Sequence, residues 1–339
     1  MPMSSPARVQ VMRAKKDALA LLLWCMSTSV SGFGVRPLVA VRQASSRCMA
    51  AMGGAGRAKA VAAEDVVEAP WRLHPEHPAA SHPKVAAIFQ YLNQHPLVVG
   101  GQPMVSSMCL LTPACGMHSL NQASFPQDYE PMHVMVKRTQ RPFASTPAFN
   151  LRPEDLPGGK TDAERLKVLE QTGQSAGDLA AATCALLQLA CGGLDECHNR
   201  ITPMSWPDGT IFGGPPIYNS VARDDATLLH CLTHVCEGRY PGEFGTGWNN
   251  AAFWNGQVGD EHPVFVQVQQ AAVAAARRFP HLEGEAVSEV QNGWTPGMFI
   301  RRCQAALDRS REMPEDKEYC DALLNAVFRL LFEHMWAKL

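Results

Sequence analysis

Two histidines and a glutamate lie at helical spacing within one short segment of the chain. The run His-Cys-Leu-Thr-His-Val-Cys-Glu holds His230, His234 and Glu237. On a helix, His234 lies about 40° from His230, and Glu237 lies about 20° from it on the other side. Imidazole and carboxylate groups on one face suit Zn²⁺, Fe²⁺ or Mn²⁺. The alternative is an ordinary solvated face of an amphipathic helix, and no HExxH motif decides between the two.

A second segment pairs an acid with a histidine. Asp195 and His198 are three residues apart, so they share a face if the segment is helical. The pair could bind a metal, or the carboxylate could orient the imidazole. The alternative is a helix C-terminus, where the negative end of the helix dipole stabilises a histidine. The candidate catalytic residues are therefore Asp195, His198, His230, His234 and Glu237. The last four of these are also the candidate ligands of a divalent metal, Zn²⁺ or Fe²⁺.

Other residues near these segments leave further options open. His262 precedes Pro263 and could either join the site or begin a helix. Cys197, Cys231 and Cys236 lie beside the histidines, so a Cys–His nucleophile stays open, although most such cysteines are inert core residues. The chain contains no GxxxxGK[ST] loop and no GxSxG elbow, which excludes P-loop phosphate binding and gives no support to a serine hydrolase.

The elements that must carry these residues are predicted to be helices. Apolar residues near helical spacing predict helices over residues 82–95, 162–171, 175–191, 224–238, 249–257, 263–279, 296–310 and 315–337. Residues 201–220 are predicted to form a Pro- and Gly-rich loop, and residues 132–136 a short strand. Strand and helix patterns do not alternate. The expected fold is therefore mainly α, an irregular helical bundle with long Pro/Gly-rich loops and no parallel sheet.

Charge divides the chain into two unlike parts. Residues 1–63 hold nine Lys or Arg and one acid, whereas the rest holds 21 basic and 31 acidic residues. An acidic body argues against nucleic acid as a partner, because nucleic-acid-binding surfaces are basic. We expect residues 1–63 to be a presequence, residues 64–160 a linker and poorly defined extension, and residues 161–339 a helical domain.

The first 63 residues have the composition of a targeting sequence. Arg13, Lys15 and Lys16 precede an apolar run over residues 18–26, which suits a signal peptide and is too short to span a bilayer comfortably. A stretch rich in Ala, Ser, Met and Arg follows, with Phe33 near its start. This order resembles the bipartite plastid presequence of algae with plastids of red-algal origin, in which a Phe commonly follows the signal cleavage point. The alternative is a secretory signal, although the chain contains no Asn-x-Ser/Thr sequon.

The C-terminal part resembles a family of uncharacterised bacterial, fungal and algal proteins. The resemblance covers about the last 150 residues and implies one common pattern for the candidate residues, but the family has no established activity. The matching residues are Gly193-Leu194-Asp195 with His198, His230 with His234 and Glu237, Asn250-Ala251 with Trp254, His262-Pro263-Val264-Phe265, Trp294 with Pro296 and Phe299, and Leu331-Phe332-Glu333-His334.

Two functions remain open at this point. The first is a plastid protein whose candidate residues converge in one pocket, forming a metal-dependent or histidine-based acid/base enzyme that acts on a small molecule. The second is a non-enzymatic helical binding or assembly factor for a plastid complex or pigment. We expect no membrane span in the mature chain. Convergence of the side chains within about 5 Å would favour the first. In the second, an interaction surface would be lined by Trp248, Trp254, Trp294 and Trp336.

Overall fold

The computed structural model describes most of the chain from residue 62 onward. The described residues are 62–100, 143–173, 175–206, 216–239, 241–242, 245–259, 261–279, 281–282, 284, 294–310 and 312–339. All of them lie in the second of two contact units, Ala58–Leu339. The expected presequence and the strand expected at residues 132–136 lie outside the described residues.

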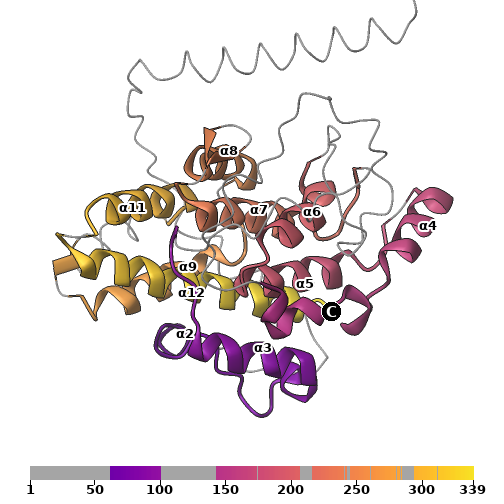
Figure 1. Cartoon of the computed structure of the whole chain (residues 1–339), viewed down its shortest axis with the longest axis horizontal. Helices are drawn as coiled ribbons and strands as arrows, with labels where there is room; N and C mark the ends of the chain where they lie inside the picture. The colour runs from indigo at the N-terminus through magenta and orange to yellow at the C-terminus, as the bar shows by residue number, and fades with distance from the viewer. Residues whose placement is uncertain are drawn as a thin grey trace, which may run out of the picture. The chain divides into compact units, whose positions relative to one another are not determined.

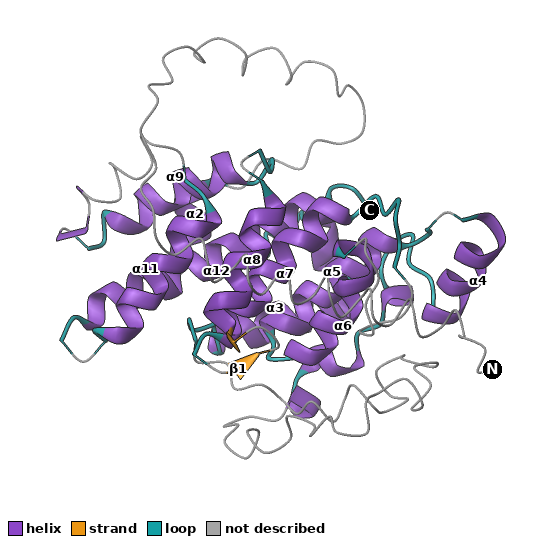
Figure 2. Cartoon of the chain, turned by 90° about the horizontal axis from the view of Figure 1, so that it is seen from above, coloured by secondary structure: helices purple, strands orange, loops and turns teal. Residues whose placement is uncertain are grey.

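Helices make up nearly all of the regular structure (Figure 2). They are α2 (Ala63–Glu68), α3 (Pro83–Gln94), α4 (Asp162–Thr172), α5 (Asp178–Ala190), α6 (Leu194–Ser205), α7 (Arg223–Glu237), α8 (Gly247–Val258), α9 (Phe265–Ala276), α11 (Pro296–Asp308) and α12 (Pro314–Trp336). The strands of the described part, β1 (Pro241–Gly242) and β2 (Gly245–Thr246), form one short antiparallel pair. The predicted mainly α fold without a parallel sheet is confirmed.

Local capping explains where two of the helices begin. The ring of His82 accepts a hydrogen bond from the Val85 amide at 3.3 Å, and Pro83 occupies the first helical position of α3. Before α4, the Thr161 hydroxyl accepts from the Glu164 amide at 3.2 Å, and the Glu164 carboxylate accepts from the Thr161 amide at 2.9 Å. This reciprocal capping box fixes the start of the helix.

The longest helix, α12, lies at the centre of the described unit. It packs against α5, α9, α11 and α2, while α5, α6, α7 and α8 pack on one another in chain order. Figure 1 shows α8 at one end of this unit and α2 with α3 at the other, with α12 and α5 between them. Every residue of α7 from Asp225 to Glu237 is buried. Polar residues on α7 therefore face protein rather than water.

The first part of the expected linker and extension, residues 64–81, contributes to the core. It forms α2, a 3-10 turn over Pro78–Ser81, and buried positions at Val66, Val67 and Trp71. The Trp71 indole donates a 2.7 Å hydrogen bond to the Asn325 side chain of α12. The segment is rich in Ala, Pro and His, and this composition predicted no packed structure. A few buried apolar residues are nevertheless enough to pack it against the bundle.

Helix α6 extends through residues that were expected to begin a loop. It continues past Pro203, which provides no amide hydrogen for the helix, and ends at Ser205. Ile201 and Met204 are fully buried in this stretch. Their burial offsets the missing hydrogen bond, so the sequence prediction of a loop from residue 201 was wrong for its first five residues.

The cysteines contribute buried thiols to the core. All seven in the described part of the chain are free and buried. No helix among the described residues is long and apolar enough to cross a bilayer.

Candidate metal centre

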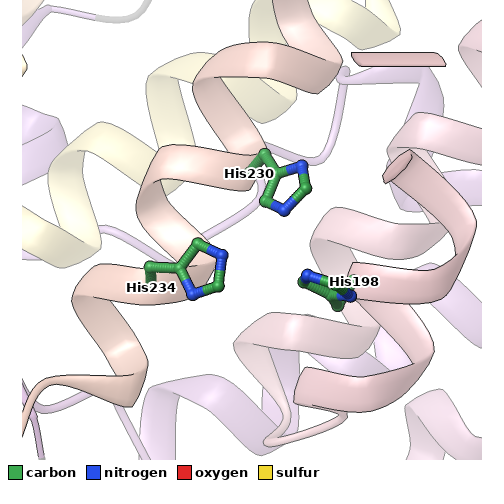
Figure 3. Close-up of side chains that lie close together, drawn as sticks. All are labelled: His198, His230 and His234. Carbon is green, nitrogen blue, oxygen red and sulfur yellow. The ribbon is translucent and has the colours of Figure 1, made fainter. Parts of the chain in front are cut away.

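Three histidines from two helices converge on one buried point. His198 comes from α6, and His230 and His234 come from successive turns of α7. Their ring centroids are 4.7, 5.4 and 5.2 Å apart. One ring nitrogen from each histidine lies within 4.8 Å of the others. Figure 3 shows the three rings around a common space, with His198 opposite the two rings of α7.

The burial of this cluster decides between the alternatives left open by spacing. His230 is 1% exposed and His234 is 7% exposed, because α6 and α8 pack against α7. The interpretation of this stripe as a solvated face is therefore wrong. His198 lies in the first half of α6 rather than at its C-terminus, which removes the helix-dipole explanation for that residue.

Each of the three rings has its Nδ1 atom close to an oxygen. For His234, Nδ1 is 2.6 Å from Oε2 of Glu237, which is also buried. A carboxylate accepts hydrogen bonds, so it places the ring proton on Nδ1 and leaves the lone pair on Nε2. This arrangement is typical of metal-binding histidines, whose second nitrogen donates to a carboxylate.

The other two rings are oriented by hydroxyl groups in the same way. The Ser205 hydroxyl donates to the Ile201 carbonyl at 3.0 Å, so it can accept from His230 Nδ1 at 2.9 Å. The Thr202 hydroxyl donates to the His198 carbonyl at 2.5 Å and lies 3.5 Å from His198 Nδ1. His230 Nε2 is buried and has no hydrogen-bond partner among the residues that the structure describes. These contacts favour the tautomers that direct Nε2 lone pairs to a shared ligand.

Burial also keeps two of the rings uncharged. Burial, together with the smaller effect of the neighbouring His234, lowers the pKa of His198 to about 3. Burial, followed by the effects of His198 and His234, lowers the pKa of His230 well below its ordinary value. Neutral imidazole is the form that binds metals, so these rings are ready to act as ligands at neutral pH.

Helix α8 also contacts the cluster, through an aromatic residue and a glycine. The Trp254 ring of α8 stacks on His230, with centroids 3.7 Å apart and planes 20° apart. At the start of α8, a Cβ on Gly247 would lie 2.7 Å from the His234 carbonyl and 2.8 Å from Glu237 Cβ. Glycine at this position therefore allows α8 to approach the site helix closely.

Two of the predicted site residues lie outside the group of three. Glu237 contacts the far side of His234 through Oε2, so that oxygen supports the ring rather than adding a fourth ligand. Asp195 is buried in the first turn of α6 and is not among the three converging residues. Sequence reasoning missed Ser205 and Thr202, because both fell in the loop predicted over residues 201–220. The position of Thr202 four residues after His198 was the available signal.

The nearby cysteines are poorly suited to nucleophilic catalysis. Burial raises the pKa of Cys197 and of Cys231 to about 12, and it also raises the pKa of Cys236. A cysteine attacks as the thiolate, which is scarce at neutral pH under these conditions. The structure therefore favours the interpretation of these residues as inert core cysteines.

Comparison with known proteins gives no further information about this site. The chain matches no protein-family model, no curated protein and no solved structure. Its function therefore has to follow from the side chains themselves.

Proposed function

We propose that His198, His230 and His234 bind a divalent metal ion, in first place Zn²⁺, and that the protein is a metal-dependent enzyme acting on a small molecule. The observation that carries the proposal is the convergence of three ring nitrogens within 4.8 Å, with an oxygen close to the Nδ1 atom of each ring. Three protein ligands leave one tetrahedral position open, as in catalytic zinc sites. A metal held this way polarises a substrate oxygen or lowers the pKa of a bound water.

The protonation of the rings favours a metal over acid/base catalysis by histidine alone. A general base works best when its pKa is near the working pH. The pKa of His198 is lowered to about 3 by burial, which makes this ring a weak base. The same shift makes it a good neutral ligand, so of the two chemistries expected from the sequence the metal-dependent one has more support.

The position of Glu237 adds an electrostatic reason for a cation. Glu237 is buried at the C-terminal end of α7, where the helix dipole disfavours a negative charge. Burying an ionised carboxylate is costly unless a positive charge compensates it. A divalent ion on the other side of His234 would provide that charge through the imidazole.

The competing function, a binding or assembly factor, has less support. Its interaction surface was expected to include four tryptophans, and all four are buried in the core: Trp248, Trp254, Trp294 and Trp336. Ordinary core packing accounts for these side chains.

Metal analysis of the purified full chain tests the proposal. We expect the His230→Ala/His234→Ala variant to lose one equivalent of bound Zn²⁺ relative to the unaltered protein. The matched control is His74→Ala, because the His74 side chain is 72% exposed and far from α7 in sequence. Equal metal content in the double variant and the unaltered protein, or none in either, would contradict the proposal.

Two further measurements address catalysis and location. In a thermal-shift screen of small metabolites, we expect ligands that stabilise the Zn²⁺-loaded protein but not the chelator-treated protein. Ligands that stabilise both forms equally would argue against a metal at the active site.

We also propose that the enzyme works in a plastid. A fluorescent fusion to residues 1–63 should enter that organelle in an alga with plastids of red-algal origin. Secretion of the fusion would contradict this location.

A further inference from the structure

A second cluster of metal-ligating side chains lies apart from the three histidines. Asp225 lies in the first turn of α7, His262 precedes α9, and His334 lies in the last turn of α12. One ligand atom from each residue lies within 4.8 Å of the other two. The cluster joins three segments separated by up to 109 positions in the sequence, and spacing therefore could not reveal it.

The distances within this cluster fit the edges of a metal coordination sphere. Asp225 Oδ1 lies 3.3 Å from His262 Nε2 and 3.2 Å from His334 Nε2. With metal–ligand bonds of about 2.1 Å, two ligands are about 3.0 Å apart at a right angle and about 3.4 Å apart in a tetrahedron. All three atoms are buried, and among the described residues the two ion pairs that join them do not meet hydrogen-bond geometry. A shared cation would give all three buried atoms a better partner.

We propose that Asp225, His262 and His334 form a second divalent-cation site that is independent of the three-histidine site. Two imidazoles and one carboxylate suit Fe²⁺, Mn²⁺ or Zn²⁺. The Asp225 and His262 side chains are each 1% exposed, whereas that of His334 is 20% exposed and offers a route for the ion. A bound ion would connect α7, the start of α9 and the end of α12.

Two contacts around the cluster compete with the ion and can be used to test for it. Lys338 Nζ lies 2.7 Å from Asp225 Oδ2 and partly neutralises the carboxylate, while Oδ1 stays available. The Val264 amide donates to His262 Nδ1 at 3.3 Å, at the long end of hydrogen bonding. Binding at Nε2 would move the ring proton to Nδ1 and give up this one weak bond. Because Lys338 competes with the ion for the Asp225 carboxylate, removing the Lys338 charge should strengthen metal binding.

The test is the number of metal ions bound by the full chain. The protein is stripped with a chelator, incubated separately with Zn²⁺, with Mn²⁺ and anaerobically with Fe²⁺, desalted and analysed for metal. We expect two equivalents of at least one of these ions in the unaltered protein. His262→Ala/His334→Ala should bind one equivalent, and His230→Ala/His234→Ala should also bind one.

Different failures of the two sites give different results. One equivalent in the unaltered protein, lost in His230→Ala/His234→Ala and kept in His262→Ala/His334→Ala, overturns the second site and leaves the first intact. The reverse pattern overturns the first site and leaves the second intact.

Two single variants provide controls for folding and for charge. Asp225→Asn keeps the side-chain shape and should lose one equivalent while its circular dichroism spectrum stays unchanged. This variant carries the test if His262→Ala/His334→Ala does not fold. Lys338→Met should keep both equivalents and bind the second ion more tightly. If Asp225→Asn keeps full metal content, or if Lys338→Met loses the second ion, the cluster is an ion-pair network and the proposal is wrong.

Discussion

At the scale of single residues, the candidate metal centre depends on which ring nitrogen holds the proton. Ser205, Thr202 and Glu237 each bring an oxygen close to the Nδ1 atom of one histidine. These residues therefore select the tautomers whose Nε2 atoms can bind a metal. The three histidines form the inner part of the candidate site. The three oxygen-bearing residues form an outer layer that orients the histidine rings.

Replacing Glu237 by glutamine tests this outer layer. Because an amide interacts more weakly with the His234 ring than a carboxylate does, we expect Glu237→Gln to fold normally and to bind Zn²⁺ about 10- to 100-fold more weakly. A competition titration against a chromophoric chelator measures the change. Glu76→Gln is the control, because the Glu76 side chain is 90% exposed. Unchanged affinity in Glu237→Gln would show that the 2.6 Å contact does not support a ligand.

At the scale of helices, the site depends on how closely α8 approaches α7. Gly247 starts α8 against the last turn of α7, and Trp254 of the same helix stacks on His230. The position of α8 thereby fixes both the burial of α7 and the orientation of one ligand ring.

Adding one methyl group to Gly247 should therefore weaken both the fold and the site. A Cβ there would overlap backbone atoms at 2.6 and 2.7 Å, so we expect Gly247→Ala to lower the free energy of unfolding by about 1–3 kcal/mol. Urea unfolding measures this loss. Gly256→Ala is a matched control in the same helix, because its Cβ would meet nothing within 4 Å. The control should be neutral or stabilising by up to about 1 kcal/mol. Equal effects of the two variants would contradict the close approach of α8.

At the scale of the whole molecule, the net charge is divided unequally along the chain. The full chain carries −2, but residues 64–339 carry −10 with neutral histidines. An acidic body attracts cations and repels nucleic acid. This balance favours cations over anions near the molecule.

The stability of the metal-free protein should fall as the pH is lowered below neutrality. In the unfolded chain a histidine takes up a proton near pH 6.5, whereas the folded pKa of His198 is about 3 and that of His230 is also well lowered. The unfolded state therefore binds more protons below pH 6.5, which favours unfolding. We expect a loss of about 2 kcal/mol for each of these two histidines, or about 4 kcal/mol together, between pH 7 and pH 5, measured by urea unfolding in chelator.

A control separates this effect from the buried aspartate. The pKa of Asp225 is lowered, with its contacts to His262, His334 and Lys338 outweighing the opposing effect of burial, so its stabilisation is lost only below about pH 4. A His230→Phe variant should show a smaller loss between pH 7 and pH 5. Stability that stays constant over this range in the unaltered protein would contradict the neutral, buried state of the histidines.

The sequence by itself determined the helical class, most helix positions and the shared face of His230 and His234. These features follow from the 3.6-residue period of the helix and from capping, which act within a few residues of the chain. The same local rules misjudged residues 64–81 and the end of α6, where long-range burial outweighs local composition.

Only the tertiary structure decided what surrounds the site helix. The packing of α6 and α8 on α7 buries the histidine stripe and brings His198 opposite it. The second cluster was also beyond local spacing, because His334 reaches Asp225 only through the packing of helices far apart in the chain. Local periodicity fixes which face of a helix a residue occupies. Burial, and the partners that come with it, depend on which distant helix covers that face.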